Sequence, residues 1–126
     1  MAKMNVRGLE LDFNPLNARH IELMASSRDK MAKYYDKIKD VDPTTMDLRE
    51  YAKWLKKACD VIISVFDDVF GEGTVDKLNL DRDDFTECFA AFEELQNGIE
   101  EAGKAGDFVK YLNDKYAPVP NESTNG

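Results

Sequence analysis

The sequence has few of the residues that catalysis and metal binding most often use. It contains one histidine, His20, and two cysteines, Cys59 and Cys88, among 126 residues. No nucleophile or carboxylate stands beside His20 in a recognisable catalytic setting, so an exposed or capping role is expected for it. The cysteines lie within apolar helical patterns, which favours packing as small hydrophobic groups over disulfide bonding. We therefore predict a noncatalytic protein that uses no cofactor and no metal ion.

Long apolar runs and an excess of basic charge are also missing. No apolar run approaches the roughly 20 residues of a membrane span, and no basic and apolar leader opens the chain, so neither secretion nor membrane insertion is expected. The net charge of −8 argues against a nonspecific nucleic-acid binder, because such proteins use Lys and Arg to displace counterions. Together these features predict a single domain in a reducing cytoplasm.

Two local patterns match known ligand sites only in part. Asp81-Arg-Asp-Asp84 begins like a calcium loop, but Phe85 follows and the central glycine is missing. Gly71-Glu-Gly73 lacks the third glycine and the preceding strand of a dinucleotide-binding fingerprint. Neither pattern predicts a binding site, so we assign the two glycines to the end of a helix.

The hydrophobic periodicity predicts a mainly α fold of three to five helices packed as a bundle, with a short N-terminal β-strand or hairpin. Apolar and polar residues alternate from Leu9 to Phe13, and Gly8 supplies a turn. The predicted organisation is an N-terminal strand or hairpin arm at 1–16, a helical domain at 17–116 and a disordered tail at 117–126. The helices are expected over residues 17–41, 47–70, 81–102 and 107–116, with one helical turn at 74–78.

The first predicted helix has an imperfect apolar stripe. Arg28 falls where the helical spacing requires another apolar residue, and we expect its methylene stem to cover the stripe while its charge stays in water. The apolar members of this stripe are Ile21, Met24, Met31, Tyr35 and Ile38.

The second predicted helix has the most regular apolar spacing, from Leu48 to Val69, and its apolar surface widens until the helix stops at Gly71. A surface helix needs only one apolar face, so the extra breadth requires burial or a partner. Two alternatives remain for what covers this apolar surface: the Phe-rich helix of the same chain or an outside partner. For the second alternative, the predicted partner-binding residues are Trp54, Val61, Ile63, Phe66 and Phe70.

The charge is unevenly distributed along the chain. Residues 19–57 carry a net charge of +3, whereas residues 60–101 carry −11. An acidic block of this kind is usually a solvated surface, and it can also dock a basic partner. An alternative function is therefore an acidic DNA mimic or regulatory protein that binds a basic protein. Mimicry needs carboxylates in a phosphate-like line, whereas here they alternate with phenylalanines.

Three segments resemble a group of small acidic proteins encoded among the tail genes of long-tailed phages and prophages. The resemblance covers residues 4–102 and is carried by the following segments: Asn5-Val-Arg-Gly-Leu-Glu-Leu-Asp-Phe13, Phe66-Asp-Asp-Val-Phe-Gly-Glu-Gly-Thr-Val-Asp-Lys-Leu78 and Glu87-Cys-Phe-Ala-Ala-Phe92. It implies a tail assembly chaperone-like protein in the cytoplasm of the bacterial host. Such proteins are thought to coat the tape-measure protein before the tail-tube protein polymerises around it.

The broad apolar end of the second helix further predicts a homo-oligomer.

Overall fold

The computed structural model describes residues 2–40, 42, 44–45, 47–104, 106, 110 and 113–114. Within these residues the chain forms four helices and a two-stranded antiparallel hairpin, which confirms the predicted mainly α fold with a short N-terminal hairpin. Most of the predicted helix at 107–116 and the whole predicted tail at 117–126 lie outside the described residues. Among the described residues, no helix is both long enough and apolar enough to cross a membrane.

The hairpin pairs β1 (Ala2–Val6) with β2 (Leu9–Phe13). Its turn consists of Arg7 and Gly8, which have φ values of 51° and 84°. Two central residues with positive φ give the turn whose twist matches that of the flanking strands. The alternating side chains that pack into the core are Met4, Val6, Leu11 and Phe13.

Helix α1 (Ala18–Lys39) begins at Asn17, whose side chain accepts a hydrogen bond from the His20 amide. Its buried stripe differs from the predicted one, because Ser27 and not Arg28 fills the position between Met24 and Met31. A small hydroxyl residue satisfies its own polar group by donating to the carbonyl of Met24, so it can occupy a buried helix position. Two residues of the predicted stripe are not buried: Ile21 is 43% exposed, and Tyr35 is 42% exposed with its ring stacked on that of Phe89.

Helix α2 (Leu48–Phe70) begins at Asp47, whose carboxylate accepts a hydrogen bond from the Arg49 amide. Leu48, the first residue of the predicted seam, is 61% exposed, so the buried seam starts later than predicted. The helix ends at Gly71, which has a φ of 112°, and the short α3 (Thr74–Leu78) follows. The predicted helix break and the predicted single turn are both present.

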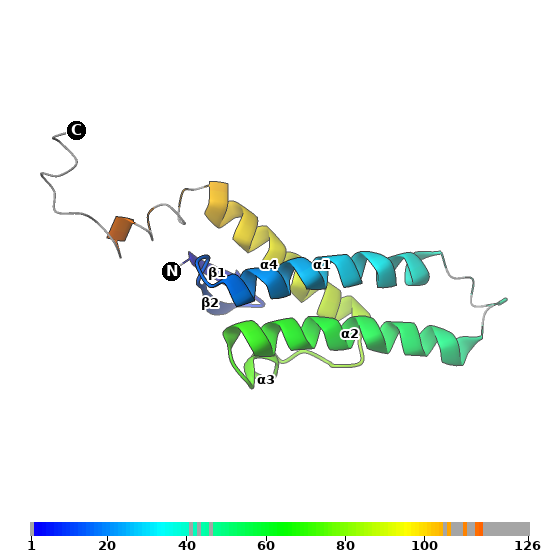
Figure 1. Cartoon of the computed structure of the whole chain (residues 1–126). Helices are drawn as coiled ribbons and strands as arrows, with labels where there is room; N and C mark the ends of the chain where they lie inside the picture. The colour runs from blue at the N-terminus through cyan, green and yellow to red at the C-terminus, as the bar shows by residue number, and fades with distance from the viewer. Residues whose placement is uncertain are drawn as a thin grey trace, which may run out of the picture.

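Helix α4 (Phe85–Lys104) begins after Asp84, whose carboxylate accepts a hydrogen bond from the Thr86 amide. Figure 1 shows α1 and α2 lying side by side, with α4 crossing them at an angle and the hairpin at one end of the pair. The core lies where α2, α4 and the hairpin meet. Its largest fully buried side chains are Phe13, Phe66, Ile62, Leu95, Val6, Val75, Cys59 and Cys88.

Arg7 joins the hairpin turn to the end of α3 and to α4. Its guanidinium donates hydrogen bonds to the carbonyls of Leu78 (2.9 Å) and Asn79 (3.2 Å), and it pairs with the Glu87 carboxylate at 3.3 Å. The hairpin is thus held by polar contacts at its turn as well as by its apolar face.

Gly98 allows α4 to lie directly on β1. A Cβ atom at this position would meet the Cβ of Met4 at 2.8 Å, which is closer than real side chains approach. A glycine inside a helix lowers the stability of that helix, so its presence needs a reason. Its position opposite Met4 therefore has a packing reason that the sequence pattern did not reveal.

The cysteines are free thiols buried in the contact between α2 and α4, as the apolar pattern around them predicts. Burial raises the pKa of the Cys59 thiol. It also raises the pKa of Cys88, which reaches about 12, with the neighbouring Cys59 as a further cause. Both thiols stay protonated at neutral pH and act as small apolar groups.

We predict that Gly98→Ala destabilises the protein by about 1–3 kcal/mol, because the new methyl group overpacks the contact with Met4. Gly103→Ala is the matched control in the same helix, since a Cβ there meets nothing within 4 Å. That variant should gain up to about 1 kcal/mol from higher helix propensity. Urea unfolding of both variants measures the difference. Equal stabilisation by the two substitutions would show that α4 does not approach β1 so closely.

We also predict that the protein loses stability as the pH rises from 9.0, the ordinary thiol pKa, toward about 12. In this window the unfolded Cys88 thiol loses its proton while the folded thiol keeps it, so the unfolded state is favoured. The free energy of unfolding should depend less on pH in Cys88→Ala than in the wild type. Because lysines and tyrosines titrate in the same range, the slope difference between the two proteins is the readout. Identical slopes would contradict the prediction.

Candidate functional site

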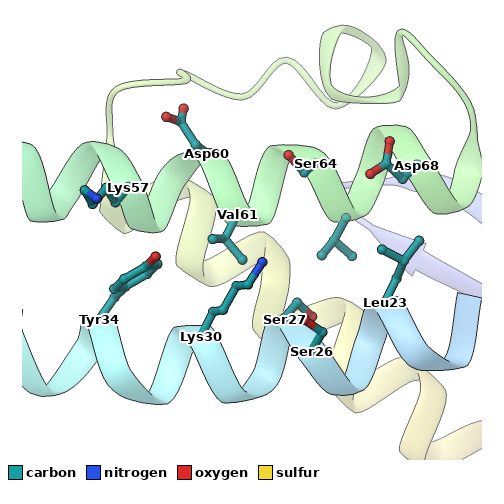
Figure 2. Close-up of a pocket in the computed structure, with 11 residues that line it drawn as sticks. Leu23, Ser26, Ser27, Lys30, Tyr34, Lys57, Asp60, Val61, Ser64 and Asp68 are labelled. Atoms are coloured by element: carbon teal, nitrogen blue, oxygen red, sulfur yellow. The ribbon is translucent and has the colours of Figure 1, made fainter.

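The described part of the structure has a groove between α1 and α2, here called the α1–α2 groove. It has a volume of about 430 Å³, within the range of ligand-binding sites. Figure 2 shows its side chains in front of α4, so the groove opens on the side of the helix pair away from α4. The lining residues are Leu23, Ser26, Ser27, Lys30, Tyr34, Lys57, Asp60, Val61, Ser64, Val65 and Asp68.

Small side chains create the groove. Ser26 and Ser27 on α1 lie at its middle, and Ser64 lines its rim on the side of α2 away from α1, as Figure 2 shows. Side chains of this size do not fill the space between two packed helices, which leucine or methionine would close. The accessible apolar part of the groove, here called its apolar floor, comes from half-buried Leu23 of α1 and half-buried Val61 of α2, whereas Val65 beneath the gap is 3% exposed.

The two ends of the groove carry different groups. The helices are antiparallel, so Tyr34 lies near Lys57 at one end and Leu23 lies near Asp68 at the other (Figure 2). We call these the Tyr34 end and the Leu23 end. Lys30 reaches from α1 toward Val61 in the Tyr34 half of the groove (Figure 2). The apolar floor is therefore bordered by cations in one half and by a carboxylate at the far end.

Two of the five predicted partner-binding residues belong to this region. Val61 lines the groove. Trp54 lies beyond the Tyr34 end, where its ring is 5.7 Å from that of Tyr34. The ammonium groups of Lys37 and Lys57 stand 5.5 Å and 5.7 Å from the Trp54 ring centroid. Trp54 is thus half-buried under side chains of its own chain.

The other three predicted residues lie elsewhere. Phe66 is fully buried in the core, and it contacts Phe70 with a ring distance of 6.2 Å. Phe70 is half-buried against Phe13 of β2, at 6.4 Å, and Ile63 packs half-buried against the same core. The structure therefore does not bring the five residues together on one surface, and Phe66 presents no area to a partner.

Three carboxylates meet at the start of α4, those of Asp81, Asp84 and Glu87, with ligand atoms within 4.8 Å of one another. Their oxygens already serve the local backbone and Arg7. Asp81 accepts from the Asp83 amide, Asp84 caps the helix, and Glu87 pairs with Arg7. Helix capping and one ion pair account for this cluster.

The acidic block at 60–101 is spread over several elements, and some of its carboxylates pair with Arg82 inside the block or with Lys56 before it. Lys56 pairs with Asp83 at 2.9 Å and with Asp60 at 3.5 Å, and these contacts raise the pKa of the Lys56 ammonium. Arg82 pairs with Asp76 at 3.0 Å. Ion pairs between exposed groups contribute little to stability, but they interrupt the negative surface.

The sequence pattern did not reveal the groove. The apolar spacing predicts a stripe of large apolar residues on α1, whereas the α1 residues that line the groove are Leu23, Ser26, Ser27, Lys30 and Tyr34. A signal was present in the adjacent serines Ser26 and Ser27, since small polar residues in a helix that packs on another helix leave space.

Comparison with known proteins gives a family but no function. A family model described as "Family of unknown function (DUF6673)" matches residues 7–125. That range includes both helices of the groove and α4. No curated protein and no solved structure matches the chain.

We predict that Lys57→Met, which keeps the aliphatic stem but removes the charge, costs about 0.5–1 kcal/mol through the lost cation–π contact. The emission of Trp54, the only tryptophan, should shift at the same time. Lys53→Met on the same helix is the control, because Lys53 makes no cation–π contact with the Trp54 ring within the described part of the chain. Urea unfolding and fluorescence spectra measure both effects. If the two variants have the same stability and the same Trp54 emission, the contact between the Lys57 ammonium and the Trp54 ring is contradicted.

Proposed function

The chain belongs to the DUF6673 family of unknown function, and we propose that it is a noncatalytic phage tail assembly chaperone that binds the tape-measure protein in the α1–α2 groove. The observation that carries this proposal is an apolar floor left open on a folded domain. The groove is lined only by α1 and α2. An elongated groove between two helices suits an amphipathic helix, which places its apolar face against the floor.

The resemblance to phage tail proteins supports the identity of the partner. The segment Phe66–Leu78 carries most of that resemblance, and it forms the end of α2, the glycine break and α3. Phe66, Val75 and Leu78 of this segment are buried in the core, so the shared motif supports a shared fold more directly than a shared binding surface. The groove supplies the binding surface in this proposal.

The acidic surface fits the same role. A chaperone for long apolar helices has to stay dissolved before and after it binds them, and a net charge of −8 favours this. We place the protein in the cytoplasm of the bacterial host, with the tail-tube protein as a further partner and a homo-oligomer as its assembled form.

The alternative, an acidic DNA mimic, receives less support from the arrangement of charges. Lys56 and Arg82 lie within the acidic surface and pair with its carboxylates. A mimic of a nucleic acid needs an uninterrupted line of negative groups. Competition with DNA for a basic protein would favour this alternative over the chaperone.

We predict that co-expression with the tape-measure protein of the same tail gene cluster keeps that protein soluble and yields a complex. Val61→Glu should abolish co-purification, because it places a charge on the apolar floor of the groove. Leu48→Glu is the control, since Leu48 is 61% exposed and does not line the groove.

Both variants should unfold at a temperature close to that of the wild type, which separates lost binding from lost folding. If the tape-measure protein stays insoluble with the wild-type chain, the chaperone function is wrong. If Val61→Glu binds as well as Leu48→Glu, the groove is not the binding surface.

A further inference from the structure

The charges around the α1–α2 groove are arranged along its axis. Lys30 and Lys57 lie in the Tyr34 half, whereas Asp68 lies at the Leu23 end (Figure 2). Asp60 also belongs to the Tyr34 half, but Figure 2 shows its carboxylate pointing away from α1, and it pairs with Lys56 at 3.5 Å. The groove is therefore basic at one end and acidic at the other.

Lys30 and Asp68 are available to a partner, whereas the Lys57 ammonium stands over the Trp54 ring. Within the part of the chain that the structure describes, neither Lys30 nor Asp68 forms an ion pair. They also stand at different points along the groove, so they do not neutralise each other (Figure 2). A charged side chain beside an apolar floor is favoured when a partner of opposite charge covers it.

A helix that enters the groove brings its own charge asymmetry. The N-terminal end of a helix carries a partial positive charge and the C-terminal end a partial negative charge. The N-terminal end is therefore favoured near Asp68, and the C-terminal end near Lys30 and Lys57. Since α1 runs from the Leu23 end to the Tyr34 end, a helix placed in this way runs parallel to α1.

We propose that the α1–α2 groove binds one amphipathic helix in a fixed direction, parallel to α1 and antiparallel to α2, with its N-terminal turn at Asp68 and its C-terminal turn at Lys30 and Lys57. This inference rests on the proposed function of the groove and adds the direction and chemistry of the partner. The bound helix has a basic side chain in its first turn, an apolar stripe over Leu23 and Val61, and an acidic side chain in its last turn. The small side chains of Ser26 and Ser27 on α1 admit a close approach of its backbone.

The test uses two synthetic peptides of about 18 residues, enough for five helical turns. They share one apolar stripe and the same hydrocarbon staple, so that both are helical. The first peptide has lysines in its first turn and glutamates in its last turn, and the second has these charges exchanged. Binding to the full chain is measured by titration at low and high salt.

The first peptide should bind about tenfold more tightly, because the exchange replaces favourable charge pairs at both ends by unfavourable ones. The difference should shrink at high salt. The double variant Lys30→Glu with Asp68→Lys should reverse the preference, an outcome that general damage to the groove would not give.

Trp54 lies beyond the Tyr34 end and reports the direction without any change to the protein. A nitroxide on the C-terminus of the first peptide should quench Trp54 fluorescence more strongly than one on its N-terminus. Equal quenching from both ends, equal affinity of the two peptides, or a preference that the double variant does not reverse would each overturn the fixed direction. Those outcomes would leave helix binding intact, whereas failure of both peptides to bind would overturn the proposed binding surface as well.

Discussion

The close packing of α4 on β1 is the contact on which the rest of the arrangement depends. It is only attainable because Gly98 offers no side chain to Met4. With α4 in this place, the hairpin and α4 together cover one side of α2, and Cys59 and Cys88 meet inside that contact. The other sides of α2 are contacted by α1 and, near the end of the helix, by α3. The groove lies on the α1 side of α2, where the small serines of α1 leave space.

Much of the fold could be predicted because its signals are local. Asn17 and Asp47 cap helices, Gly8 belongs to a turn, and Gly71 ends α2, each for reasons that act within a few residues. The face of α1 could not be predicted in the same way. Helical spacing alone does not decide which of two neighbouring residues is buried. Large side chains such as Arg28 and Tyr35 fit the predicted stripe, whereas Ser27 is the residue that is buried in the structure.

The candidate site shows the same division between local and long-range causes. The breadth of the apolar surface near Phe66 correctly indicated a helix contacted from several sides, but not which side stays open. Phe66 is buried in the core, and Phe70 packs against Phe13, which lies in a strand more than fifty residues earlier in the chain. Of the five predicted partner-binding residues, only Val61 lines the groove, which small serines of α1 leave open. The apolar periodicity of α2 carries no information about how large the side chains are that α1 places opposite it.

The tie between Arg7 and α4 has a consequence for how the chain folds. The Arg7 amide donates to Glu94, 87 positions away, so the hairpin and α4 close a loop that contains almost the whole domain. Closing a loop of this length costs chain entropy before the contact returns any free energy. A two-stranded hairpin is marginal by itself in water. We therefore expect the α1–α2 pair, which needs only a short connection, to form early, and the strands at the start of the chain to be among the last elements to become ordered.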